Sequence, residues 1–143
     1  MPAAQRSGVD LALRIVAAAS VLVIGAVHLK LYFDGYRDVP NANVGRSILL
    51  NAVASLVVAV GLVVWRHWLV LLAGLVLVDA TLVAFALSRT DRGIFGFSES
   101  GFNPSPEAAL AVTAEIAAAA LLLGLLVLEW SPSQRATVVA RRG

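Results

Sequence analysis

Residues 68 to 87 read Trp68-Leu-Val-Leu-Leu-Ala-Gly-Leu-Val-Leu-Val-Asp-Ala-Thr-Leu-Val-Ala-Phe-Ala-Leu87, an apolar run with a single charged side chain, Asp79, near its middle. About 20 consecutive apolar residues cross the roughly 30 Å hydrocarbon core of a bilayer. The stretch therefore predicts a membrane-spanning helix. A carboxylate at the centre of such a helix costs on the order of 2.5–3.5 kcal/mol on insertion scales. Asp79 therefore predicts neighbouring helices that shield it from lipid.

The composition of the chain places it among membrane proteins. Of its 143 residues, 59% are hydrophobic and 14% are charged, whereas a soluble domain carries about 25% charged residues. One membrane domain with the lipid bilayer as its first partner is expected. The net charge of +2 comes from basic residues scattered at the ends of apolar segments, a pattern typical of membrane proteins rather than of nucleic-acid binding. The absence of cysteine excludes disulfides, thiolate metal sites and iron–sulfur clusters.

Three further apolar segments resemble the first in length, so the predicted fold is all-α, a polytopic membrane protein with four transmembrane helices in an antiparallel bundle. The spacing Ser7-Gly-Val-Asp10 is that of a capping box, and Ser105-Pro-Glu107 is a typical helix start. The short connection Arg66-His67 requires that the helices on either side of it be antiparallel neighbours. A cleaved signal peptide is the alternative for the first segment. The predicted helices cover residues 10–31, 46–65, 68–87 and 106–128.

Two loops and a tail connect and follow these helices. With four spans, the loops 32–45 and 88–105 lie on one side of the membrane, and the tail 129–143 lies on the other side with the N-terminus. Six of the eleven basic residues fall on the side of the termini, which favours cytoplasmic termini in a bacterial plasma membrane. Three aromatic residues of the second loop, Phe95, Phe97 and Phe102, are expected to cover the mouth of the bundle or the membrane interface.

Five polar side chains fall within the predicted helices and form the candidate site for a proton, a cation or a small ligand. A rise of about 1.5 Å per residue places the two acids, Asp79 and Glu115, near mid-membrane together with Ser55. It places Asn51 and His28 nearer the loops. If they face one another, they line a polar path from the loops to the bilayer centre.

A purely structural role is the alternative interpretation for each of these polar side chains. Asn51 and Ser55 can be satisfied by hydrogen bonds between helices, and His28 can lie at the membrane interface. Two ionised acids at one depth would repel each other, so Asp79 and Glu115 predict one protonated acid unless a cation pairs with them. Both interpretations of the polar residues remain open from the sequence.

Known catalytic and cofactor motifs are missing. The chain has no phosphate-binding loop, nucleophile elbow or His-Glu-x-x-His pattern, so no catalytic residue, metal ligand or cofactor is predicted. A membrane enzyme is left as a third interpretation, after the two given below. The two histidines, His28 and His67, fall at opposite ends of the predicted bundle, which excludes a haem held between them. Small four-helix multidrug transporters carry their acid in the first helix, where this chain has Arg14.

Several short motifs are spread over most of the chain: His28-Leu-Lys-Leu-Tyr32, Gly35-Tyr-Arg37, Val39-Pro40, Gly96-Phe97, Gly101-Phe102 and Asn103-Pro-Ser-Pro-Glu107. In these the chain resembles small uncharacterised four-helix membrane proteins of high-GC bacteria, a resemblance that implies no activity. The leading interpretation is a binding or accessory subunit, within a homo-oligomer or a larger membrane complex. The alternative is a proton- or cation-coupled transporter or small-ligand binder that uses its intramembrane carboxylates.

Overall fold

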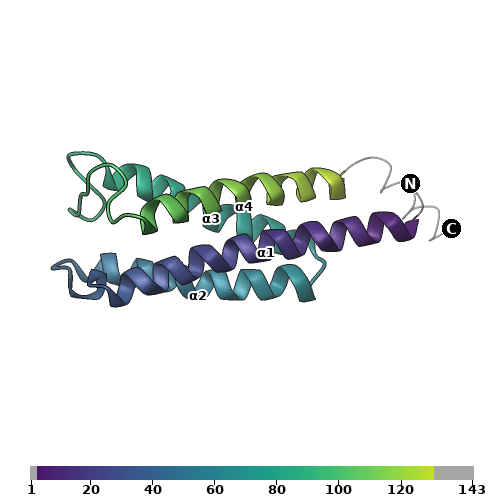
Figure 1. Ribbon diagram of the computed structural model, residues 1–143, viewed down its shortest axis with the longest axis horizontal. Helices are drawn as coiled ribbons and strands as arrows, with labels where there is room; N and C mark the ends of the chain where they lie inside the picture. The colour runs from purple at the N-terminus through teal and green to yellow at the C-terminus, as the bar shows by residue number, and fades with distance from the viewer. Residues whose placement is uncertain (1–2, 131–143) are drawn as a thin grey trace.

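The computed structural model describes residues 3–130, with side chains from residue 8 onward. Within that range the chain forms four long α-helices and one short 3₁₀ helix, and no β-strand (Figure 1). The elements in chain order are α1 (Ala3–Phe33), η1 (Tyr36–Asp38), α2 (Ala42–Val64), α3 (Trp68–Ser88) and α4 (Glu107–Trp130).

All four long helices are suited to cross a membrane, which confirms the predicted polytopic four-helix fold. The apolar spans are Gly8–Phe33, Ala42–Val64, Trp68–Ser88 and Glu107–Trp130, and the shortest has 21 residues. At about 1.5 Å per residue, 21 residues reach about 32 Å, enough for the hydrocarbon core.

The helices form a ring in which each helix packs against its neighbours in sequence. Helix α1 packs against α2 and α4, and α3 packs against α2 and α4. One end of the bundle, called here the terminal end, holds the start of α1, the turn at residues 65–67 and the end of α4 (Figure 1). The other end, called here the loop end, holds η1 and the long connection between α3 and α4. The ring therefore closes between the first helix and the last.

Two helix starts differ from the predicted ones. Helix α1 begins at Ala3, so the predicted start at the Ser7–Asp10 capping box is wrong and that spacing lies inside a helix. Helix α2 begins at Ala42 and not at residue 46, because the Asn41 side chain caps it by accepting a hydrogen bond of 3.0 Å from the Asn43 backbone N–H. The loop that precedes α2 is correspondingly short.

Helix α4 continues to Trp130, so Glu129, predicted to start the tail, is helical. The rest of the predicted tail, residues 131–143, lies outside the described residues.

Ion pairs join α1 to α4 at both ends of the bundle. At the terminal end, the buried guanidinium of Arg14 pairs with Asp10 at 3.1 Å and with Glu129 of α4. At the loop end, Lys30 pairs with Glu107 of α4 at 2.9 Å. The first and last helices are thus held together by charge at two widely separated points.

The core between these pairs is apolar and closely packed. Its buried residues come from all four helices and include Ala17, Val21, Ile24, Ala59, Leu62, Leu71, Val78, Ala118, Leu122 and Leu125. Helices α1 and α2 approach closely at Gly25, where a Cβ atom would lie 2.8 Å from the Ser55 Cβ. Small residues at such crossings allow membrane helices to pack with their backbones close together.

Candidate functional site

A cavity of about 130 Å³ lies in the loop-end half of the bundle, among side chains from all four helices and from the loops. Apolar residues such as Leu31, Ile48, Phe85 and Val112 make up most of its wall. The polar lining falls into two groups. His28, Ser47, Thr81, Ser88 and Glu115 come from the helices, and Tyr36, Arg89, Glu99 and Asn103 come from the loop end.

Glu115 is the unusual member of this lining. It belongs to the inward face of α4, together with Ala108, Ala111, Ala118 and Leu122, at the spacing expected for one side of a helix. The residue is 1% exposed, and its Oε2 atom has no hydrogen-bond partner among the described residues. A buried carboxylate without a donor or a cation is costly. This oxygen is therefore suited to hold a proton or a positively charged group in the cavity.

His28 lies on α1 and lines the same cavity. Its Nδ1 donates to the Ile24 carbonyl at 2.9 Å, so in the neutral ring Nε2 is the remaining nitrogen and acts as an acceptor. His28 is thus both satisfied locally at one nitrogen and brought together with Glu115 around one cavity.

Asn51 and Ser55 are satisfied by hydrogen bonds within the bundle. Ser55 donates to the Asn51 side-chain oxygen at 3.3 Å, and Asn51 donates through Nδ2 to the Thr81 hydroxyl on α3 at 2.5 Å. Thr81 in turn donates to the Leu77 carbonyl at 2.8 Å. Neither Asn51 nor Ser55 lines the cavity. They support the wall at Thr81, which does line it.

Asp79 lies on the side of α3 that faces away from the cavity, opposite to Thr81. It is exposed, does not line the cavity, and makes no hydrogen bond or ion pair with another described residue. Successive helical residues are about 100° apart, so Asp79 and Thr81 point in nearly opposite directions. The expectation that Asp79 is shielded by its own bundle is wrong, and the structure does not bring Asp79 and Glu115 together.

The two loops close the loop end of the cavity through a hydrogen-bond network. Tyr36 donates to Glu99 Oε1 at 2.5 Å, and Arg89 donates to Glu99 Oε2 at 3.1 Å. Arg89 also donates to the backbone carbonyls of Gly101 and Asn103, at 2.6 and 2.7 Å. These contacts are called here the cap network. They fix the long connection over the cavity, as expected for loops that cover the mouth of the bundle.

Partial burial and the cap network alter the acidity of Tyr36. Burial of its ring, and then the hydrogen bond to Glu99, raise the pKa of the Tyr36 hydroxyl well above its usual value. The phenol therefore stays protonated and remains a donor to Glu99 over the whole physiological range.

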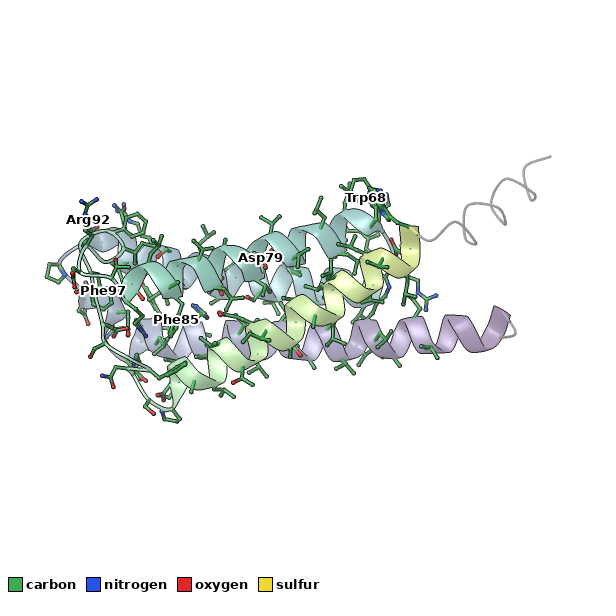
Figure 2. The ribbon with its side chains drawn as sticks, turned by 90° about the horizontal axis from the view of Figure 1, so that it is seen from above. Trp68, Asp79, Phe85, Arg92 and Phe97 are labelled. Carbon is green, nitrogen blue, oxygen red and sulfur yellow. The ribbon has the colours of Figure 1, made fainter. Side chains whose placement is uncertain are left out.

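The three phenylalanines of this connection take different positions. Phe97 lines the cavity and packs edge-on against Tyr36. Figure 2 shows Phe85 and Phe97 near the same end of the bundle, opposite Trp68. Phe102 packs against Phe85 with ring centres 5.7 Å apart, but the Phe102 residue is 55% exposed. Phe95 is 49% exposed. Only Phe97 therefore covers the cavity.

Seven polar lining residues were not among the site residues expected from the sequence: Tyr36, Ser47, Thr81, Ser88, Arg89, Glu99 and Asn103. Thr81 lacked a signal because threonine is common in membrane helices. Glu99 could have been noted as an acid inside a loop rich in Gly and Phe, where a charged side chain needs a partner. No group of three or more His, Asp or Glu side chains in the described part of the chain could hold a metal ion.

The fold and the site define a class, a four-helix membrane protein with a cavity that its loops cover at one end. In the described part of the chain, one buried carboxylate in this cavity has an oxygen without a hydrogen-bond partner. Comparison with protein-family models finds no match, and comparisons with curated proteins and with solved structures find none either.

Proposed function

We propose that the chain is a membrane-embedded binding protein for a small, positively charged ligand. The observation that supports this is the Glu115 carboxylate, which is buried, lines the cavity and has one oxygen without a hydrogen-bond partner among residues 8–130. The acidic Glu99, in contrast, is already paired with Arg89 and Tyr36. Glu115 is thus the group in the cavity that gains most from an incoming cation.

The size and walls of the cavity narrow the class of ligand. A single water needs about 10–15 Å³ of such space, so a cavity of about 130 Å³ holds a group much larger than one water. The largely apolar wall suits methyl or methylene groups, and the lone acid suits one positive charge. A small organic ammonium ion combines these two properties.

A proton is the smallest cation that Glu115 can bind. A proton and an organic cation at the same oxygen exclude each other, because protonation removes the negative charge that attracts the cation. Such competition is the basis of proton-coupled transport, which is the second candidate function. The capped cavity supports binding first, since transport also requires a second opening toward the terminal end.

The proposed setting is the plasma membrane of a bacterium, with both termini in the cytoplasm. Its support is the slight excess of basic residues on the side of the termini. In this orientation the cap network faces outward, and the ligand enters from outside the cell.

The test uses a hydrophobic carbodiimide, which modifies protonated carboxyl groups that are shielded from water. Purified protein in detergent is treated with dicyclohexylcarbodiimide, and the modified residue is identified by mass spectrometry of peptides. We expect Glu115 to be modified, and the reaction to slow when methylammonium, trimethylammonium, tetramethylammonium or guanidinium chloride replaces sodium chloride. Glu107, which is ion-paired with Lys30, is the internal comparison.

The Glu115→Gln variant is the matched control and should lose modification at this position while it keeps its thermal unfolding temperature within a few degrees. Protection of Glu115 by none of the four cations would contradict the proposal. Equal protection by sodium and by the organic cations would also contradict it, because the apolar wall would then play no part.

A further inference from the structure

Helix α3 has the least covered surface of the four spans. Only 17% of its membrane-spanning window is buried inside the chain, compared with 28–39% for the other three. Leu72, Val76, Asp79 and Val83 are all exposed and are spaced four, three and four residues apart. They therefore follow one side of the helix. This surface is called here the α3 outer face.

Asp79 occupies the middle of the α3 outer face at the depth where water is absent. It is 11 residues from Trp68 and nine from Ser88, which at about 1.5 Å per residue places it roughly 16 Å and 14 Å from the two helix ends. Figure 2 shows Asp79 about midway between Trp68 and the loop end. A carboxylate that contacts lipid at this depth is unfavourable, and acids in such positions normally face a partner.

The part of the chain that the structure describes offers no base at this depth. All but one of the described basic residues lie near or beyond the ends of the helices. Lys30 is in the last turn of α1, Arg46 is the fifth residue of α2, and Arg89 directly follows α3. The long helices do not include Arg37, Arg66 or Arg92. Arg14 is buried and paired with Asp10 and Glu129. A second copy packed on the α3 outer face would thus bring only its own Asp79 to the same level, where two carboxylates repel.

We propose that the α3 outer face binds a transmembrane helix of another protein that carries a lysine or arginine at mid-membrane. The partner base pairs with Asp79, and the flanking Val76 and Val83 provide a flat apolar surface on either side of the pair. Opposite charge at matching depth both neutralises the acid and fixes the depth of the partner helix. This assigns the chain an accessory role within a larger membrane complex, independent of any ligand at Glu115.

The test uses a synthetic partner of known sequence. Three leucine-rich transmembrane peptides, alike except for Lys, Gln or Leu at the central position, each carry one cysteine near that position. The protein contains no cysteine, so Val76→Cys provides the single reactive thiol one turn from Asp79. Protein and peptide are reconstituted together in phosphatidylcholine vesicles, and disulfide cross-linking is measured after mild oxidation.

We expect roughly tenfold more cross-linking to the Lys peptide than to the Leu peptide, with the Gln peptide between them. Adding Asp79→Asn to Val76→Cys should reduce cross-linking to the Lys peptide to the level seen with the Gln peptide. Adding Glu115→Gln instead should leave cross-linking to the Lys peptide unchanged. Val57→Cys, on the exposed side of α2, is the control position and should show no preference among the peptides.

Equal cross-linking to all three peptides would overturn the proposal. Cross-linking of Val76→Cys mainly to a second copy of the chain, undiminished by the Lys peptide, would also overturn it and would identify a homodimer. If Asp79→Asn does not fold, Asp79→Glu replaces it. Glu keeps the charge, so the preference for the Lys peptide should persist in that variant, and its loss there would count against a charge pair.

Discussion

The hydroxyl of Tyr36 joins the two loops over the cavity, and its acidity reports whether the cap network exists. Burial, followed by the hydrogen bond to Glu99, raises the pKa of Tyr36. In the Tyr32→Phe variant Tyr36 is the only tyrosine. We expect its absorbance near 295 nm to rise only at a pH above that of free tyrosine, whose pKa is about 10.

The sign of the linked stability follows from the direction of this shift. A group whose pKa is raised by folding contributes stability below its unfolded pKa and loses that contribution as the pH rises through its folded pKa. The Tyr36 contribution should therefore be complete below about pH 10 and decline only above it. In Glu99→Gln the pKa of Tyr36 should fall but stay raised, because burial is the larger cause. Ionisation of Tyr36 at the pH of free tyrosine would show that the network does not form.

The contrast between Asp79 and Thr81 shows why individual residues could not all be placed from the sequence. Helix α3 is apolar on every side, so no polar stripe marks which face turns inward. Asp79 suggested a polar interior, but the interior contact is made by Thr81, two residues further along. The sequence placed Asp79 and Glu115 in the interior by depth alone, and only Glu115 lies there, on the alanine-rich inward face of α4.

At the level of helices, the closest contact between α1 and α2 is at Gly25, where an added methyl group would meet Ser55 and the Ala52 carbonyl. Gly25→Ala should therefore separate the two helices and reduce the free energy of unfolding by about 1–3 kcal/mol. Thermal unfolding in detergent measures this loss.

Gly124 supplies the matched control, since nothing lies within 4 Å of the position of its added Cβ. Gly124→Ala should be neutral or raise stability by up to about 1 kcal/mol, the difference in helix propensity between the two residues. Equal effects of the two substitutions would mean that α1 and α2 are not in close contact at Gly25.

The four helices could be predicted because each is a long apolar run bounded by turn residues and charges. The ends of the helices were predicted less accurately than their existence. Ser7 and Asp10 have the spacing of a cap, but nothing in residues 3–9 stops a helix, so α1 begins earlier. The cap network could not be predicted, because it joins Tyr36 to Glu99 across 63 residues of sequence and depends on how two loops fold back on the bundle.

At the level of the whole molecule, the two acids inside the membrane act separately. Glu115 lines the cavity and Asp79 lies on the α3 outer face. The effects of Asp79→Leu and Glu115→Leu on the unfolding free energy should therefore add, to within about 0.5 kcal/mol, as expected for independent sites. The wild-type protein and the three variants of this cycle are compared by thermal unfolding, and a coupling above about 1 kcal/mol would show that the acids interact.

The orientation of the bundle is tested with single cysteines in a chain that has none. Asn43 and Ser100 are exposed at the loop end, and Arg66 is exposed at the terminal end. With cytoplasmic termini, cysteines at 43 and 100 should react in whole cells with a maleimide that cannot cross the membrane, and one at 66 should react only after lysis. Labelling of position 66 alone in intact cells would reverse the orientation.

The ion pairs between α1 and α4 also set an order of events during synthesis. Arg14 enters the membrane region with the first helix, but Glu129 follows 115 residues later, after the other three spans have been made. Until then Asp10 is the only acid that faces Arg14. Lys30 likewise has the local acid Asp34 as its partner before Glu107 is made. Until the last helix arrives, each of these two bases therefore has only the acid four residues away as its partner. The ring closes only when translation of the fourth span is complete.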